Sequence, residues 1–336
     1  MKNVSIKDLA ARVGVSATTV SFVLNGKGKE KGISEDLQEQ IRSVAAELKY
    51  RPNEMARGLR TGQTHTLGLM VEDISNPFFA RLAKVVEDEA EKEGYRAIYC
   101  STENNDSKAS GLLYMLKQRQ MDGFIIIPTQ GMLRELEELV IEERPLVLVD
   151  RFFPELRATS VTVDNYSCSK AGVDLMFAKG ARKIALVTVD SIQQQMMDRN
   201  KGYFDSIVQF GGEVDQDCIL KLPFPLALEN TVSMIKEFLT NFTNLGGVFF
   251  TTNYLGVAGL EAIKGMDINI PEDLKVLCFD DNDLFRIVKP SITVIAQPID
   301  AIGELAVRSL VNMISSKNLA PARHVFEPTL VIRDSI

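Results

Sequence analysis

The sequence has few of the residues that metal sites and enzymes commonly use. Its 336 residues include only two histidines, His65 and His324, and both lie far from any motif. The four cysteines are scattered, at Cys100, Cys168, Cys218 and Cys278. Because no Cys-x-x-Cys pair occurs, we expect reduced core cysteines and neither a zinc site nor a disulfide framework. The chain also lacks a Gly-x-Ser-x-Gly, a phosphate loop and a dinucleotide fingerprint. We therefore expect no catalytic residue, no metal and no cofactor.

Long apolar runs are absent too. No run approaches the ~18 residues that a membrane-spanning helix needs, and the polar N-terminus has no signal-peptide core. Apolar residues make up 45% of the chain and charged residues 25%, which is ordinary for a soluble globular protein. We expect a cytoplasmic protein with no membrane partner.

Charge is distributed unevenly along the chain. Residues 1–64 hold 11 Lys and Arg against 7 Asp and Glu, while the whole chain has a net charge of −7. A basic segment joined to an acidic remainder indicates that the first segment binds a polyanion, which the remainder would repel. The sequence therefore favours a nucleic-acid partner for the N-terminal segment.

The first 50 residues show the pattern of a helix-turn-helix within a three-helix domain. Ser5 is placed to cap a first helix, with Asp8 three residues later, and Gly14 supplies the left-handed residue that ends it. Ser16 and Ser34 are placed to cap two further helices. The expected inward faces are Ile6, Leu9, Ala10, Val13, Val20, Val23, Leu24, Leu37, Ile41, Val44, Ala45 and Leu48. Such helices also occur in domains that bind no DNA, but the positive charge favours a DNA reader.

The remainder alternates between apolar strand patterns and helices. The predicted strands are 67–71, 95–100, 123–127, 146–149, 183–189, 246–250 and 275–279, with a last strand-like run over Val325–Ile332. Strands buried on both faces and separated by helices indicate parallel sheets. About 270 residues exceed one comfortable core, so we expect two similar lobes with a ligand cleft at the carboxyl ends of their strands.

Together these residues resemble the LacI family of bacterial transcriptional regulators, over nearly the whole chain. The motifs that carry the resemblance are Ile6–Ala10, Gly14–Ser16, Thr19–Ser21, Val23–Gly26, Leu48–Asn53, Ala56, Leu59–Gly62, Asn76–Phe79, Asp122-Gly123 and Phe279–Asp281. The resemblance implies a small all-α helix-turn-helix head and an α/β, periplasmic-binding-protein-like body of two Rossmann-like lobes with parallel sheets. The expected boundaries are 1–50 for the head, 51–64 for a hinge and 65–336 for the body. The first lobe would comprise about 65–163 and 296–323, and the second about 164–295 and 324–336.

In the head and hinge, the resemblance assigns residues to DNA. Those implied to contact DNA are Ser5, Ser16, Ala17, Thr18, Thr19, Ser21, Phe22, Asn25, Tyr50, Asn53, Ala56 and Leu59. Phe22 departs from the family pattern, which has a basic residue there. An aromatic ring can pack on a thymine methyl group, and the alternative is that Phe22 turns into the core. The basic stretch Gly26–Gly32 is longer than usual and is expected to form a solvated loop that touches phosphates.

The hinge pattern, Asn53–Arg60, covers only two helical turns after Pro52. Isolated helices this short are marginal in water, so we expect the segment to fold on DNA against its copy in a dimer. The resemblance implies that Leu59 opens a central base step from the minor groove. The alternative is that Leu59 seats the head on the body.

In the body, the resemblance assigns a second set of residues to a small-molecule effector. They are Asn76, Phe78, Asp150, Arg151, Arg199, Asn253, Asp280 and Gln297. Carboxylates, amides and guanidinium groups bind adjacent hydroxyls in pairs, and an aromatic ring packs on the C–H face of a sugar. This set suits a neutral polyol, although Arg151 leaves a carboxylated or phosphorylated sugar open. Several of the residues also have structural interpretations, Asp280 as a loop cap and Arg151 in a salt bridge between lobes.

The expected protein is a homodimeric repressor, associated with the nucleoid, that binds a pseudo-palindromic operator in double-stranded DNA and responds to a sugar. A corepressed regulator or an activator is the alternative, and a sugar-binding protein without a DNA role is a more distant one. Because no Leu-heptad tail follows residue 332, we expect a dimer and not a tetramer. Its interface is expected near Phe79, Leu82 and Val86, a stripe that core packing explains equally well.

Overall fold

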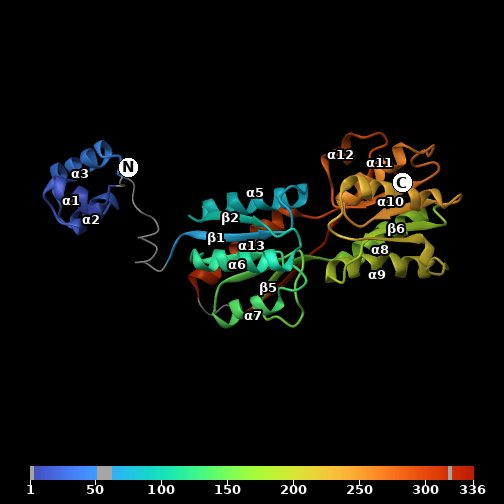
Figure 1. The fold of residues 1–336 in the computed structure, drawn as a ribbon, viewed down its shortest axis with the longest axis horizontal. Helices are drawn as coiled ribbons and strands as arrows, with labels where there is room; N and C mark the ends of the chain where they lie inside the picture. The colour runs from blue at the N-terminus through green and yellow to red at the C-terminus, as the bar shows by residue number, and fades with distance from the viewer. Residues whose placement is uncertain (1–3, 51–62, 317–319) are drawn as a thin grey trace. The chain divides into compact units, whose positions relative to one another are not determined.

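The computed structural model describes residues 4–50, 63–316 and 320–336, which form two compact units, 1–64 and 65–336 (Figure 1). The expected hinge over 51–64 therefore lies almost wholly outside the described residues.

The first unit is a bundle of three helices, α1 (Ile6–Val13), α2 (Ala17–Leu24) and α3 (Glu35–Glu47). Ser5 and Asp8 form a capping box, in which the Asp8 carboxylate accepts from the Ser5 N–H at 2.8 Å. Gly14 ends α1 with φ +77°, and Ser16 Oγ accepts from the Thr19 N–H at 3.0 Å. The prediction that the Ser34 side chain caps α3 is wrong. Ser34 precedes α3 but makes no cap hydrogen bond, and Glu35 and Asp36 supply negative charge to the first turn instead.

The inward faces predicted for the three helices are confirmed. The buried core of the head is Leu9, Ala10, Val20, Val23, Ile41 and Ala45, and the other expected apolar residues pack around it. The head therefore closes on a small core of six buried apolar side chains, surrounded by partly buried ones.

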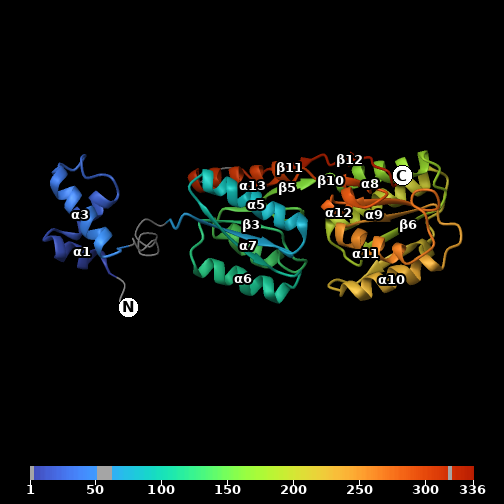
Figure 2. The same cartoon turned by 90° about the horizontal axis from the view of Figure 1, so that it is seen from above.

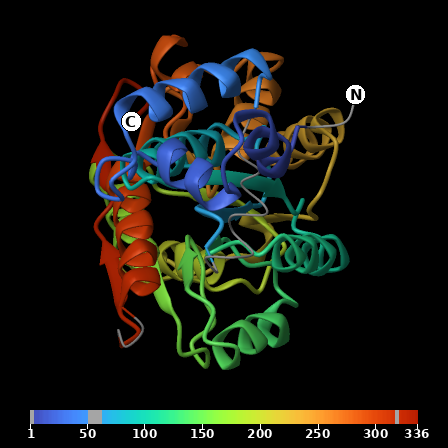
Figure 3. The same cartoon turned by 90° about the vertical axis from the view of Figure 1, so that its left-hand side faces the viewer.

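The first lobe of the body contains a six-stranded parallel sheet in the order β11-β5-β4-β3-β1-β2. Its strands are β1 (Thr66–Val71), β2 (Arg96–Ser101), β3 (Gly123–Ile126), β4 (Leu146–Val149), β5 (Thr159–Val163) and β11 (Arg323–Phe326). Helices α5 (Pro77–Lys92) and α13 (Ile299–Ser315) cover one face, and α6 (Asp106–Gln118) and α7 (Leu133–Ile141) cover the other (Figure 2). Helix α13, the red helix in Figure 3, packs against α5 and over β3, β4 and β5.

The second lobe repeats this plan in the order β12-β10-β9-β8-β6-β7, with only β12 antiparallel. Its strands are β6 (Ile184–Val189), β7 (Ile219–Leu222), β8 (Gly247–Phe250), β9 (Lys275–Phe279), β10 (Thr293–Ala296) and β12 (Thr329–Val331). Helices α8 (Asn165–Ala178) and α9 (Gln194–Gln209) pack on one face, and α10 (Leu228–Thr240) and α11 (Asn253–Lys264) on the other. The short elements η1 (Gln216–Cys218) and α12 (Asp283–Ile287) complete it.

The end of the chain differs from the prediction. The expected single run over Val325–Ile332 is two strands in different sheets, β11 in the first lobe and β12 in the second. The boundary predicted between residues 323 and 324 therefore put all of β11 except Arg323 in the wrong lobe. Glu327-Pro328 separates the two strands, and proline cannot donate a hydrogen bond to a strand ladder.

None of the helices in the described ranges is long and apolar enough to cross a bilayer.

Candidate functional site

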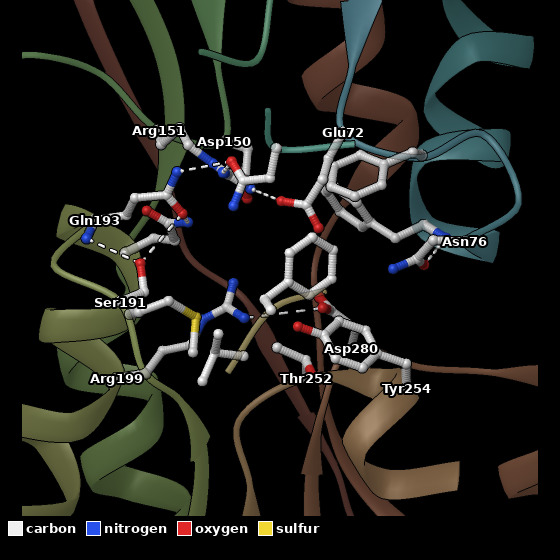
Figure 4. A pocket seen from close by; sticks show the side chains of 17 residues that line it. Glu72, Asn76, Asp150, Arg151, Ser191, Gln193, Arg199, Thr252, Tyr254 and Asp280 are labelled. Carbon is white, nitrogen blue, oxygen red and sulfur yellow. Dashed lines mark hydrogen bonds and ion pairs between the residues drawn. The ribbon is translucent and has the colours of Figure 1, made fainter. Parts of the chain in front are cut away.

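A pocket lies where the carboxyl ends of the strands of both lobes converge, with an empty volume of about 490 Å³ (Figure 4). Its lining follows β1, β2 and β4 of the first lobe and β6, β7, β8 and β9 of the second. Small-molecule sites in proteins commonly lie at this place in α/β sheets. The side chains that line it are Glu72, Asn76, Phe78, Phe79, Asn104, Asp150, Arg151, Val189, Ser191, Gln193, Gln195, Met196, Arg199, Phe224, Thr252, Tyr254 and Asp280.

The structure brings six of the eight residues expected to bind an effector into this lining. They are Asn76, Phe78, Asp150, Arg151, Arg199 and Asp280. Asn253 and Gln297 are not part of the lining, but each donates a hydrogen bond to a residue that is, Asn76 and Asp280 respectively. All eight residues therefore lie at one site, six of them in the pocket lining and Asn253 and Gln297 hydrogen-bonded to that lining.

Arg199, from α9, is buried and held from several sides. Its Nε donates to Asn165 Oδ1 and its Nη1 to the Thr251 carbonyl, both at 2.8 Å. Its guanidinium group lies 3.5 Å from the centre of the Phe279 ring, and Nη1 is 3.9 Å from Asp280 Oδ2. The side chain is thus fixed in one orientation, with its charge facing the Asp280 carboxylate.

Asp280 directly follows β9 and has a left-handed backbone, with φ +68°. Its Oδ1 accepts from Gln297 Nε2 at 2.6 Å. Burial raises the pKa of Asp280 to about 6, although Arg199 and the Gln297 hydrogen bond oppose the rise. A desolvated carboxylate at the end of a strand is a strong acceptor for ligand hydroxyls, because water does not compete for it.

Asp150 holds the corresponding place in the first lobe. It directly follows β4, also has φ +68°, and lines the same pocket. Left-handed backbone is uncommon for a residue other than glycine, and such strain is concentrated at functional sites. The two lobes thus each turn one aspartate carboxylate toward the pocket.

Arg151 is the centre of a buried ionic cluster. Its Nη2 donates to Glu72 Oε2 at 2.7 Å, its Nε to Asp150 Oδ2 at 3.1 Å and its Nη1 to Asn104 Oδ1 at 3.3 Å. Burial disfavours the charge, but the carboxylates of Glu72 and Asp150 outweigh it and raise the pKa of Arg151. All these partners belong to the first lobe, so Arg151 does not form the salt bridge between lobes that was its alternative role.

Two hydrogen bonds cross from one lobe to the other beside the pocket. Asn253 Nδ2 donates to Asn76 Oδ1 at 2.9 Å, and Gln193 Nε2 donates to Asn104 Oδ1 at 3.1 Å. Asn76 Oδ1 also caps α5, accepting from the Phe78 N–H at 3.0 Å. A change in the angle between the lobes would therefore break or shift contacts at the pocket itself.

Most of the remaining lining was not predicted from the sequence, notably Glu72, Asn104, Gln193, Gln195 and Tyr254. Glu72 follows β1 immediately, so its position at a strand end was the one available signal. Burial raises the pKa of Tyr254, which keeps its hydroxyl neutral. Gln195 is 5% exposed, and its Oε1 accepts no hydrogen bond from any described residue. Because buried polar groups are normally paired, this oxygen is available to a ligand.

In the head, the residues expected at DNA lie on and around α2. Ser5, Ser16, Thr18 and Asn25 are exposed, and Thr19, Ser21 and Phe22 are half-buried. Ala17 and Tyr50 pack partly against the core. Asn53, Ala56 and Leu59 lie outside the described residues. These assignments stay predictions.

Phe22 lies against the basic loop and outside the head core. Its ring centre is 5.4 Å from Lys31 Nζ, a cation–π distance, and it is not among the described apolar side chains of the core cluster. The loop is compact, since the Lys27 N–H donates to the Phe22 carbonyl and the Ile33 N–H to the Gly28 carbonyl. This arrangement favours the outward orientation expected for Phe22 over an inward one.

Taken together, a basic helix-turn-helix head and a two-lobed body with a polar pocket define a DNA-binding regulator with a ligand-binding domain. Three family models agree with this division. Residues 5–53 match bacterial regulatory proteins of the lacI family, 64–238 match the periplasmic binding proteins and sugar binding domain of the LacI family, and 173–336 match a periplasmic binding protein-like domain.

Relatives and solved structures match along the whole chain. The ribose operon repressor of Haemophilus influenzae is 31% identical, over 99% of this chain and 98% of its own. The transcriptional regulator RegA of Clostridium saccharobutylicum is also 31% identical, over 98% of both chains. The lac repressor dimer bound to operator and an anti-inducer is 18% identical and shares the fold with a TM-score of 0.85, over 99% of both chains.

The chain therefore belongs to the LacI family, and the resemblance found in the sequence is confirmed. It is a sequence-specific DNA-binding transcriptional regulator and not an enzyme, and a small ligand bound between the lobes controls its binding to DNA. In the part of the chain that the structure describes, no group of three or more His, Cys, Asp and Glu side chains is arranged to hold a metal ion.

Proposed function

We propose that the protein is a repressor that releases its operator when a sugar or sugar derivative occupies the pocket. The observation that carries the proposal is the pocket's lining, in which carboxylates, amides and guanidinium groups surround aromatic rings, notably Phe78 and Tyr254. Paired polar groups bind adjacent hydroxyls, and rings pack on the C–H faces of sugars. The names of relatives support the class, since the Haemophilus relative is a ribose operon repressor and a LacI-family structure from Enterococcus faecium holds ribose.

The ligand would control operator binding by changing the angle between the two lobes. The bonds Asn253–Asn76 and Gln193–Asn104 join the lobes beside the pocket, so a ligand that inserts hydroxyls among these amides changes the preferred angle. In a homodimer that change separates the two hinges and uncouples the heads. By linkage, operator DNA must weaken ligand binding by the same factor.

On DNA, two heads would read half-sites about 34 Å apart in a pseudo-palindromic operator, with the helix that begins after Ser16 in the major groove. Thr18 and Phe22 would face bases, and Ser16 and Asn25 would contact phosphates. A protein with this target works in the cytoplasm, associated with the nucleoid.

A thermal-shift screen of the purified protein against sugars, sugar acids, sugar phosphates and nucleobases tests the ligand class. A ligand at 100 times its Kd adds about 2.7 kcal/mol to the unfolding free energy, which raises the Tm of a body this size by several degrees. Repeating operator binding with the hit gives the sign of the response. A hit that tightens DNA binding would contradict the proposed release and show corepression, and a panel without a sugar hit would contradict the ligand class.

A further inference from the structure

The pocket has an unusual balance of charge for a site that contains two arginines. Its charged lining consists of the carboxylates of Glu72, Asp150 and Asp280 and the guanidinium groups of Arg151 and Arg199. Among the described residues of the lining, no lysine or histidine adds positive charge. With all five groups ionised, the pocket carries one negative charge.

The positive charge of Arg151 is directed into the protein. Each of its three nitrogens donates to a first-lobe oxygen, on Glu72, Asp150 and Asn104, and the side chain is 7% exposed. A bidentate contact with a carboxylate or phosphate on a ligand would require two of these bonds to break. Arg151 is thus already engaged, and Glu72 provides the shortest of the three bonds.

The carboxylates, in contrast, keep acceptor capacity. Glu72 binds Arg151 through Oε2 and Asp150 binds it through Oδ2, and no described group donates to Glu72 Oε1 or Asp150 Oδ1. Asp280 uses Oδ1 for Gln297, while its Oδ2 is 3.9 Å from Arg199. Figure 4 shows these carboxylates from both lobes around one space. Hydroxyl groups can donate to them, whereas an anionic ligand would bring like charges together in a desolvated site.

We propose that Glu72, by engaging Arg151, makes the pocket select an uncharged polyol and reject the sugar acid or sugar phosphate of the same carbon skeleton. The inference rests on the proposed sugar-binding function and deepens it. Glu72 is then a specificity-determining residue, and the neutralised Arg151 orients the carboxylates for hydroxyl groups.

Matched pairs of ligands test the inference by isothermal titration calorimetry on the full-length protein. The probes are D-ribose with ribose 5-phosphate, and D-glucose with D-glucuronate and glucose 6-phosphate. For the carbon skeleton that binds, we expect the neutral member to bind at least ten-fold more tightly than its anionic partner. Equal or tighter binding of the anionic partner would overturn the inference while leaving the proposed function intact. If no member of these pairs binds, the pair is made from the sugar that the thermal-shift panel identifies; if that panel contains no sugar hit, the proposed function fails, and the inference fails with it.

The substitution Glu72→Gln tests the residue itself. Because glutamine keeps the side-chain shape and an oxygen that can accept from Arg151, the folded structure is expected to persist. The substitution removes only the negative charge. We expect the neutral-to-anionic ratio to fall by about ten-fold or more in this variant. Glu137→Gln on α7, which removes an exposed carboxylate in the same lobe, should leave the ratio unchanged. A ratio that Glu72→Gln also leaves unchanged would refute the role of Glu72.

Discussion

The raised pKa of Asp280 predicts how the stability of this protein depends on pH. Its pKa is about 6 in the folded chain, against 3.8 for an unperturbed aspartate, and its burial is nearly complete. The folded state therefore takes up a proton near pH 6 that the unfolded chain takes up only near pH 4. As pH falls through this window, Asp280 stabilises the folded state, and the stabilisation is lost again as pH rises above 6. One pKa unit corresponds to about 1.36 kcal/mol, so Asp280 should raise the free energy of unfolding by about 2–3 kcal/mol between pH 7.5 and pH 4.

Urea unfolding of the wild-type protein and of the Asp280→Asn variant, followed by far-ultraviolet circular dichroism at pH 4, 5, 6 and 7.5, measures this effect. The informative quantity is the wild-type free energy of unfolding minus that of the variant at each pH. The subtraction cancels the contributions of the other carboxylates and of Arg199 to the free energy of unfolding, because both proteins contain these groups. We expect the difference to move in favour of the wild type by about 2–3 kcal/mol from pH 7.5 to pH 4. A difference that stays constant with pH would refute the argument that burial controls the ionisation of Asp280.

Three further predictions concern the two binding functions. Arg199→Ala removes the guanidinium group held at Asn165 and Thr251, so ligand response should be lost while operator binding in a gel-shift assay persists; loss of operator binding by a folded variant would contradict separate sites. Phe22→Ala should weaken operator binding by about 1–3 kcal/mol and relax the preference at one base pair, with unchanged binding placing the ring outside the interface. Replacing Lys27, Lys29 and Lys31 of the loop together should flatten the salt dependence of operator affinity, by about one unit of slope for each phosphate that the loop no longer neutralises. An unchanged slope would show that the loop does not contact phosphates.

The sequence predicted the head well because its signals are local. A capping box at Ser5 and a left-handed Gly14 lie within one helical turn of the structure they define. Their energies depend on neighbours in the chain, so the order of residues is sufficient to find them. Ser34 shows the limit, since the residue type favours a cap but the side chain does not form the bond.

In the body, β1, β2, β3, β4, β6, β8 and β9 were predicted from their apolar runs, whereas β5, β7 and β10 were missed. Strand β5, Thr-Ser-Val-Thr-Val over Thr159–Val163, is buried throughout although three of its five side chains carry hydroxyl groups. Its Thr162 hydroxyl donates to the carbonyl of His324 on β11, 162 residues further along the chain. Such a strand becomes favourable only after the sheet supplies distant partners, which a local pattern does not contain.

The candidate site also combines residues that the sequence predicted with residues whose role depends on distant partners. Asp150, Arg199 and Asp280 were predicted because they match family positions, and all three line the pocket. Glu72 was not, since its role depends on Arg151, which is 79 positions away in the chain. The sequence by itself determined the helix-turn-helix, the parallel-sheet body and which strand ends carry polar residues. The tertiary structure alone decided which charges pair, which oxygens remain open and which carboxylate is desolvated, because those properties arise from distances between residues remote in sequence and from the removal of water.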